Sequence, residues 1–403
     1  MTTATASLAV LTTGAAAIAT AREYAASIAG GVIDRDRAGT VPVAELAALD
    51  ASGLLGITVP AEHGGGGLPA SVLAEVIRTI AAVDPAIAQV PQSHYLFVDV
   101  LSVWGSPEQQ RRLFAAVLAG ARLGNGLAER GGQHAQDLKT RVYSTAGGPR
   151  LHGRKYYCTG AITAAWIGVS ALDDDGRLVL SFVERDAPGV TVDDDWDVMG
   201  QRATVSGTAS FENVAVDPAL IVPYGEVFEV PQQLGARAQL VHAAIQTGIA
   251  GAALRDAGEF VRTRARPFFE AARAGWAERA SADPHTLLRY GRLATRVAAA
   301  EALLASAAAT LDEVTRTPRT AQEAARGSVA IAEAKAFASE VAEQVASDLF
   351  ALSGASAADQ RYDLSRHWRN ARTHASHDPA DWKYHHIANY LLNNVPPPNH
   401  GQI

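Results

Sequence analysis

Two histidines, two arginines and one aspartate are concentrated in the eleven residues from Arg369 to Pro379, Arg-Asn-Ala-Arg-Thr-His-Ala-Ser-His-Asp-Pro. Histidine is the side chain whose ordinary pKa lies nearest neutral pH, so His374 and His377 are suited to moving protons beside a reaction centre. The Asp378-Pro379 step is typical of the start of a helix, and His377 could instead only cap that helix. This segment holds the first candidates for chemistry in the chain.

The same region offers a potential cluster of metal ligands, because His385 and His386 follow His374 closely. Structural and catalytic zinc sites need three or four ligands that converge on one ion, and the spacing here brings no carboxylate into the set. We therefore expect no metal, and we expect His374 to pack structurally.

Three regions with different hydrophobic patterns must position this segment. Helical periodicity comes first, a period-two pattern with recurring turns follows, and helical periodicity then returns. We predict an α+β protein with a helical domain over residues 1–120, a β domain over 121–232 and a helical bundle over 233–403.

Turns and strands are clearest in the middle region. Residues 178–183 and 209–216 predict strands, and the glycine-containing segments 146–149 and 173–176 predict hairpin turns. In the last region, long helical stretches with short connections are typical of an antiparallel bundle. These stretches are 236–265, 285–315, 320–352 and 379–393.

The composition excludes several classes of function. A net charge of −7 argues against nucleic acid or an anionic membrane surface as a partner. No apolar run reaches the ~18 residues that a membrane span needs. The alanine-rich stretch 4–20 lacks the basic start and cleavage site of a signal peptide, so we expect a helix there. The single cysteine, Cys158, excludes an intrachain disulfide, is expected to be buried rather than nucleophilic, and favours a cytoplasmic location.

Three motifs in the middle of the chain resemble those of the acyl-CoA dehydrogenase family. They are Leu-Ala-Glu-Arg-Gly-Gly over 127–132, an L-x-G-x-K strand and turn over 151–160, and an M-G-x-R-x-T-x-S segment over 199–206. The resemblance covers essentially the whole chain. It implies an N-terminal helical domain, a central β-barrel-like domain and a C-terminal four-helix bundle, with flavin between the β domain and the bundle. It also implies a homotetramer built through the bundle.

Other segments resemble a narrower branch, the flavin-dependent monooxygenases that include dibenzothiophene monooxygenases and sulfur-acquisition oxidoreductases. These segments are Trp196, 264–268, 281–284 and 367–374, with 89–94 and 364–379 for the sulfur-acquisition group. The branch implies reduced FMN from a separate NAD(P)H-dependent flavin reductase and its reaction with O₂ to a C4a-hydroperoxide. It further implies oxygen transfer to a small organosulfur compound such as a sulfide, sulfone, sulfinate or thiophene-like ring.

Two departures from the dehydrogenase pattern support this branch. The turn that carries the dehydrogenase glutamate reads His-Ala-Ser-His over 374–377 here. The Q-x-x-G-G segment that holds the adenosine of FAD reads Phe-Ala-Leu-Ser-Gly over 350–354, without the glutamine. Both losses fit the shorter FMN, with FAD as the alternative cofactor. Ser356 stands where dibenzothiophene monooxygenases carry an arginine, which leaves the phosphate contacts and the substrate open.

The resemblance assigns catalytic roles to three residues. His377 matches a histidine placed over the flavin and would supply the proton that turns the C4a-peroxide into the hydroperoxide. The hydroxyl or N–H of Thr159 would bond the N5/O4 edge of the flavin. His94 would orient substrate or hydroperoxide. The alternatives are an ordinary strand-end threonine for Thr159 and a satisfied core histidine for His94.

Six positions match contacts to FMN in the same branch: Asn125, Tyr157, Thr159, Trp196, Ser206 and Arg266. The two aromatic rings offer flat faces to the isoalloxazine, although Trp196 could also simply pack in the core. Ser206 and Arg266 can bind the phosphate, for which arginine supplies a fork of donors. Arg262 and Arg264 are alternatives to Arg266 as the phosphate ligand.

Three other functions stay open. The first is an acyl-CoA dehydrogenase whose base lies elsewhere in the bundle. The second is a flavin monooxygenase of the same fold that hydroxylates nitrogen or carbon, because the walls of the pocket choose the substrate. The third is a non-catalytic flavin-binding or scaffold protein, which would not need His94, Thr159 and His377 together.

Overall fold

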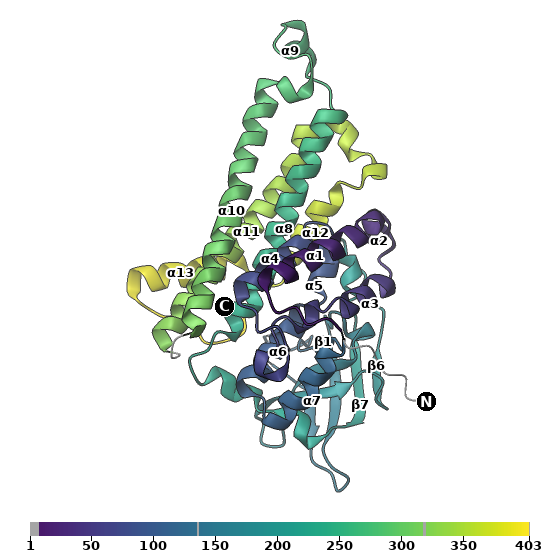
Figure 1. Cartoon of the computed structure of the whole chain (residues 1–403), viewed down its shortest axis with the longest axis vertical. Helices are drawn as coiled ribbons and strands as arrows, with labels where there is room; N and C mark the ends of the chain where they lie inside the picture. Colours follow the sequence, from purple (N-terminus) through teal and green to yellow (C-terminus); the bar gives the residue numbers. More distant parts are fainter. Residues whose placement is uncertain (1–7, 135–136, 317–319, 403) are drawn as a thin grey trace.

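The computed structural model describes residues 8–134, 137–316 and 320–402 of the 403-residue chain. Short helices come first, a sheet follows, and long helices end the chain, in the order that the sequence pattern predicts (Figure 1). The predicted N-terminal helix begins at Gly14, and residues 4–7 of the alanine-rich stretch lie outside the described residues. No helix in the described ranges combines the length and the apolar character that a membrane crossing requires.

The first region consists of short helices, most of which start after a polar capping side chain or a proline. They are α1 (Gly14–Ile28), α2 (Val32–Ala38), α3 (Val43–Ala51), α4 (Ala70–Ala81), α5 (Pro85–Gln89), α6 (Gln92–Trp104) and α7 (Pro107–Leu118). α5 begins at Pro85 because the side chain of Asp84 accepts hydrogen bonds from the N–H groups of Ala86 and Ile87. α6 packs on both α8 and β1, so this region joins the sheet to the bundle.

The second region is one mixed sheet. Its strands are β1 (Leu123–Gly126), β2 (Arg141–Tyr143), β3 (Arg150–Lys155), β4 (Trp166–Leu172), β5 (Leu178–Glu184), β6 (Val190–Val192), β7 (Ala209–Ala215) and β8 (Ile221–Val222). The pairing order is β6-β7-β3-β2-β4-β5-β8, and β1 runs parallel to β4 beside this path. Both predicted hairpin turns are confirmed, because antiparallel pairs join β2 to β3 and β4 to β5.

Long helices dominate the third region. Its helices are α8 (Leu234–Thr263), α9 (Phe269–Arg273), α10 (Pro284–Arg316), α11 (Ala321–Ser353), α12 (Ser365–Ala375) and α13 (Ala380–Asn393). α11 packs against α8, α10, α12 and α13. The long helices extend away from the sheet, and α9 lies at their far tip (Figure 1). The four predicted stretches become α8, α10, α11 and α13. Periodicity does not predict α12, because its eleven residues are mostly polar.

One contact joins the bundle to the β domain beside the predicted chemistry. The Oδ1 atom of Asn370, in α12, accepts the N–H of Gln201 at 2.5 Å. The two backbones approach so closely that a Cβ atom on Gly200 would lie 2.0 Å from the carbonyl oxygen of Arg369. Only glycine fits there without a shift of the main chain. This contact fixes the end of α12, which leads directly into His377.

Candidate active site

A tight turn after β3 carries several predicted site residues. Tyr157 has a φ of +57°, a conformation that is uncommon for a tyrosine and concentrates at functional sites. Neighbouring segments hold the turn in place. The N–H of Cys158 donates to the carbonyl of Gly207 at 3.0 Å, and the carbonyl of Thr159 accepts the N–H of Asn125 at 3.2 Å. The side chain of Thr159 is therefore carried on a fixed backbone.

Three hydroxyl groups form a hydrogen-bonded row that ends on a carbonyl. Thr159 Oγ1 lies 2.7 Å from Ser206 Oγ, which lies 2.8 Å from Thr204 Oγ1. Thr204 donates to the carbonyl of Gln201 at 2.9 Å. Each hydroxyl has one proton and a carbonyl only accepts, so all three bonds form only if Thr159 donates to Ser206 and Ser206 donates to Thr204. The proton of Thr159 is therefore committed, and its oxygen is left to accept a hydrogen bond from a ligand.

Two aromatic side chains lie beside this row. The rings of Tyr157 and Trp196 meet edge to face, with centres 6.1 Å apart and planes at 88°. Trp196 Nε1 donates to the carbonyl of Gln201 at 2.9 Å, while Tyr157 keeps 44% of its surface exposed. The structure thus brings together five of the six predicted cofactor residues: Asn125, Tyr157, Thr159, Trp196 and Ser206.

A group of three histidines lies at the end of α12. His374 Nε2 is 3.1 Å from His242 Nδ1 and 3.2 Å from Gln89 Oε1. The ring of His377 faces that of His242, with centres 4.3 Å apart and planes at 36°. His242 and His374 are buried, whereas the side chain of His377 is 44% exposed. His377 is therefore the member of this group that a ligand can reach.

The carboxylate next to His377 is held by two lysines. Asp378 pairs with Lys335 and, at 2.8 Å, with Lys383, and its Oδ1 lies 3.6 Å from His377 Nδ1. Burial alone would raise the pKa of Asp378, but the adjacent His377 and the two lysine ammonium groups hold that pKa well below its ordinary value. Burial lowers the pKa of Lys335 to about 8. Asp378 is thus an ion-pair partner that is poorly suited to act as a base.

The capping alternative for His377 does not agree with this geometry. α13 begins at Ala380 after Pro379, and among the described residues no side chain caps its first turn. Sequence patterns do not single out His242 or Lys335, although each is a polar residue within an apolar helical run. In such a run a buried polar side chain needs a specific partner, and that is the signal that could have found both residues.

The hydroxyl row and the histidine group lie on either side of the end of α5. Gln89, the last residue of α5, bonds to His374. The next residue, Val90, lies against the turn after β3, because a Cβ atom on Gly160 would be 2.8 Å from its Cγ1. The end of α5 therefore contacts both the turn that carries Thr159 and the histidine group that includes His377, at the junction of the β domain and the bundle. No set of His, Cys, Asp or Glu residues in the described part of the chain converges as a metal site.

His94 occupies a different environment from the one predicted for a catalytic residue. It is fully buried in α6. Its Nδ1 accepts the N–H of Leu123 at 3.2 Å, and its Nε2 lies 2.9 Å from the carbonyl of Leu55, to which it donates. Burial lowers the pKa of His94 to about 4, so the ring is neutral. With both nitrogens bonded to the main chain, the geometry favours the alternative of a core histidine that joins α6 to β1.

Arg266 is not brought to the candidate site within this chain. It is exposed in the link between α8 and α9. α9 lies at the end of the long helices opposite to the sheet (Figure 1). Arg262 pairs with Glu259 at 3.0 Å, and Arg264 donates to the hydroxyl of Tyr362 at 3.2 Å. α8 has 30 residues, which makes it about 45 Å long, so it carries all three arginines away from the sheet.

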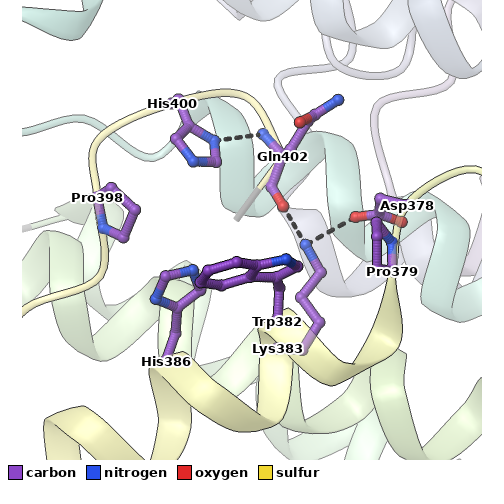
Figure 2. A pocket seen from close by; sticks show the side chains of 8 residues that line it. All are labelled: Asp378, Pro379, Trp382, Lys383, His386, Pro398, His400 and Gln402. Carbon is purple, nitrogen blue, oxygen red and sulfur yellow. Dashed lines mark hydrogen bonds and ion pairs between the residues drawn. The ribbon is translucent and has the colours of Figure 1, made fainter. Parts of the chain in front are cut away.

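A cavity of about 310 Å³ lies next to Asp378, between α13 and the C-terminal segment (Figure 2). Its lining residues are Asp378, Pro379, Trp382, Lys383, His386, Pro398, His400 and Gln402. The rings of Trp382 and His386 stack with centres 5.7 Å apart. Lys383 bonds both Asp378 and the carbonyl of Gln402, so the cavity shares Asp378 with the histidine group.

Successive parts of the chain match the three domain models of one enzyme family. The N-terminal, middle and C-terminal domains of the acyl-CoA dehydrogenases match residues 15–121, 126–214 and 240–382. The dibenzothiophene monooxygenase of Rhodococcus erythropolis is 32% identical over 391 residues, which is 93% of each chain. The chain belongs to the acyl-CoA dehydrogenase family. The predicted fold is confirmed.

Within the acyl-CoA dehydrogenase family, the chain resembles flavin-dependent monooxygenases. The probable FMNH₂-dependent monooxygenase SfnC of Pseudomonas putida is 32% identical over 390 residues, covering 94% of this chain and 96% of that protein. The crystal structure of FMN-bound TdsC from Paenibacillus sp. A11-2 superposes with a TM-score of 0.91 at 30% identity. It covers 96% of this chain and 100% of TdsC. The predicted monooxygenase branch of the acyl-CoA dehydrogenase family is confirmed.

The buried, neutral His94 predicts a loss of stability in acid. The unfolded chain binds a proton at a pKa of about 6.5, whereas the folded chain does so near 4. The contribution of neutral His94 to the free energy of unfolding is therefore complete above about pH 6.5 and is lost as the pH falls toward 4. At pH 5 the loss is roughly 2 kcal/mol. Chemical unfolding at pH 7.5 and pH 5 should show that His94→Gln reduces this pH dependence, whereas His152→Gln, at an exposed histidine, should not. Equal pH dependence in all three proteins would contradict the assignment.

Proposed function

We propose that this protein is a two-component monooxygenase that uses reduced FMN and O₂ to oxygenate a small organosulfur compound. The observation that carries the proposal is that the end of α5 contacts both the histidine group that includes His377, a reachable imidazole, and the turn that carries the hydroxyl of Thr159. An oxygenation needs a proton donor and a fixed polar contact. A dehydrogenation needs a free carboxylate, and Asp378 is paired with two lysines.

The side chains of the site fit FMN. Thr159 offers an acceptor oxygen, and the N5 of a reduced flavin carries a hydrogen to donate. Both amide atoms of Gln201 are buried without a partner among the described residues, and so is Nδ1 of His374. Such atoms fit a ligand with polar edges. The ring of Tyr157, which is 44% exposed, would pack against the flavin.

When bound, reduced FMN would supply the electrons that activate O₂ for the transfer of one oxygen atom, which is chemistry that no side chain performs. The chain's own residues orient, protonate and exclude water. We assign the proton to the ring of His377, whose direction is set by its neighbours His242 and Asp378. Thr159 fixes the flavin edge. We assign His94 to holding α6 against β1, in place of a role in catalysis.

The relatives support the proposed substrate class and partners. A dibenzothiophene monooxygenase and an FMNH₂-dependent monooxygenase cover more than nine-tenths of this chain. A sulfide, sulfone, sulfinate or thiophene-like ring is the proposed substrate, and an NAD(P)H-dependent flavin reductase is the proposed partner. The alternative is a related monooxygenase that oxygenates nitrogen or carbon.

In a homotetramer, Arg266 could contact the site of another subunit. The tip that carries it also exposes three large aromatic side chains, which a subunit interface would cover. These are Phe268, Phe269 and Trp276. We propose that Arg266 reaches the flavin phosphate of another copy, since the length of α8 keeps it from its own site.

The activity can be tested with ¹⁸O₂. The protein, FMN, NADH and a flavin reductase are incubated with dibenzothiophene, a dialkyl sulfide, a sulfone and a sulfinate. Mass spectrometry should find one product that contains one ¹⁸O atom. An amine and a phenol in the same panel test the nitrogen- and carbon-oxygenating alternative. Oxidation of an acyl-CoA without oxygen uptake would contradict the proposal.

Replacing His377 by asparagine should separate oxygen consumption from product formation. Asparagine keeps a polar side chain but cannot transfer a proton, and acid–base groups typically contribute roughly 10²- to 10⁴-fold. We expect product per O₂ to fall by at least about 10²-fold, with hydrogen peroxide in its place. His386→Asn, outside the hydroxyl row and the histidine group, is the matched control. Unchanged coupling in His377→Asn would contradict the role of His377.

The direction of the hydroxyl row predicts a preference for reduced FMN. The hydroxyl oxygen of Thr159 can only accept a hydrogen bond. It can therefore bond to the N5–H of reduced flavin, but not to the N5 of oxidised flavin, which carries no hydrogen. Thr159→Val should therefore weaken the binding of reduced FMN about fivefold, the scale of one hydrogen bond, and leave the binding of oxidised FMN within twofold. Anaerobic fluorescence titration measures both. Thr159→Ser should resemble the wild type. A loss that is equal for both flavin forms would contradict the predicted direction of the row.

A further inference from the structure

α8 carries a buried polar stripe along one face. Gln239, His242 and Gln246 follow one another at spacings of three and four residues, which places them on the same side of the helix. Each is at most 1% exposed, and most of the residues around them are alanine, leucine, isoleucine or valine. Burying polar groups is costly unless they find partners, so this stripe requires an explanation.

Each member of the stripe forms a hydrogen bond either with the segment that carries His377 or with Lys335, which pairs with Asp378 in that segment. Gln246 Nε2 donates to the carbonyl of Ala371 in α12 at 3.1 Å. His242 Nδ1 lies 3.1 Å from His374 Nε2. Gln239 Oε1 accepts from Lys335 at 2.5 Å, and Lys335 pairs with Asp378. The stripe thus follows the chain from α12 into the turn that contains His377.

The hydrogen bonding fixes the orientation of the His242 ring. Burial, with the nearby charges of His377 and Lys335, lowers the pKa of His242 well below its ordinary value, and burial lowers the pKa of His374 to about 3. Both rings are therefore neutral. If His374 carries its proton on Nε2, both His242 Nδ1 and Gln89 Oε1 can accept it. The other tautomer would place that proton on Nδ1, which is buried without a partner among the described residues. His242 Nδ1 is therefore the acceptor.

With its edge held by His374, His242 turns its face to His377. The two ring centres are 4.3 Å apart and the planes are inclined by only 36°. The other close partner of the His377 ring is Asp378, at 3.6 Å from Nδ1. A side chain that is 44% exposed on one side is thus backed by a rigid, buried ring on the other.

We propose that His242 is a positioning residue for the reaction, whose ring backs His377 and fixes the direction in which that imidazole meets the flavin. The role rests on the proposed function, because it needs His377 as the proton donor. The face of the ring does the positioning. The hydrogen bond to His374 orients that face. A phenyl ring confined in the same buried space should present the same face to His377.

Two kinds of variant separate the ring from its nitrogen atoms. His242→Phe keeps a flat ring and lacks the nitrogen atoms, whereas His242→Leu has no ring. We expect product per O₂ to fall roughly tenfold to a hundredfold in His242→Leu, the scale of misplacing a catalytic group by about 1 Å. The KM for the organosulfur substrate should stay within about twofold. His242→Phe should stay within about twofold of the wild type in both quantities. If His242→Leu does not fold, His242→Met supplies a variant of similar volume without a ring.

A second readout needs neither flavin nor turnover. The rate at which diethyl pyrocarbonate modifies His377, measured by peptide mass spectrometry on the flavin-free protein, should rise severalfold in His242→Leu. It should stay near the wild-type rate in His242→Phe. Unchanged coupling and unchanged modification in His242→Leu would overturn the proposal, as would equal losses in both variants. Absence of oxygenation by the wild-type protein, together with the expected modification rates, would refute the proposed function and keep the positioning of His377 by His242.

Discussion

The contact between Asn370 and the backbone of Gln201 is the interaction on which the candidate site depends. It fastens α12 to the loop before β7, and the absence of a side chain at Gly200 lets the two backbones meet. On one side of this contact, the carbonyl of Gln201 ends the hydroxyl row that directs Thr159. On the other side, α12 runs into the turn with His377. A single junction therefore sets both halves of the site, although they lie more than 200 residues apart in the sequence.

The ionic partners behind His377 serve position more than stability. Asp378 and its two lysines are nearly inaccessible to water, and an ion pair of this kind recovers little more than the cost of removing its charges from water. Loss of one member leaves the others unpaired, which is far more costly. The network therefore penalises any movement of the turn, and it does so without placing a free charge on the side that the flavin occupies in the proposed function.

The turn that carries Thr159 and the histidine group differ in how much of their structure could be predicted from the sequence. Thr159, Ser206, Tyr157 and Trp196 could be predicted because short motifs resemble those of a known family, although Thr159 and Ser206 are 47 residues apart and meet only in the folded β domain. His242 could not be placed, since its partner is 132 residues further along the chain and only the packing of α8 against α12 joins them. His94 shows the opposite case. Its residue type suggests chemistry, but both ring nitrogens form hydrogen bonds with the main chain. No local sequence pattern reveals a hydrogen bond to a distant backbone group.

Cys158 precedes Thr159 in the chain, yet it lies on the other side of the turn, fully buried among the apolar residues of the sheet. Burial raises the pKa of its thiol to about 12. Oxidants attack the thiolate, and hardly any thiolate exists at such a pKa. A centre that activates oxygen releases peroxide whenever substrate is missing. In the proposed function, the one thiol in the chain would lie beside the source of that peroxide and would nevertheless be protected, so repeated turnover need not damage the turn that holds Thr159.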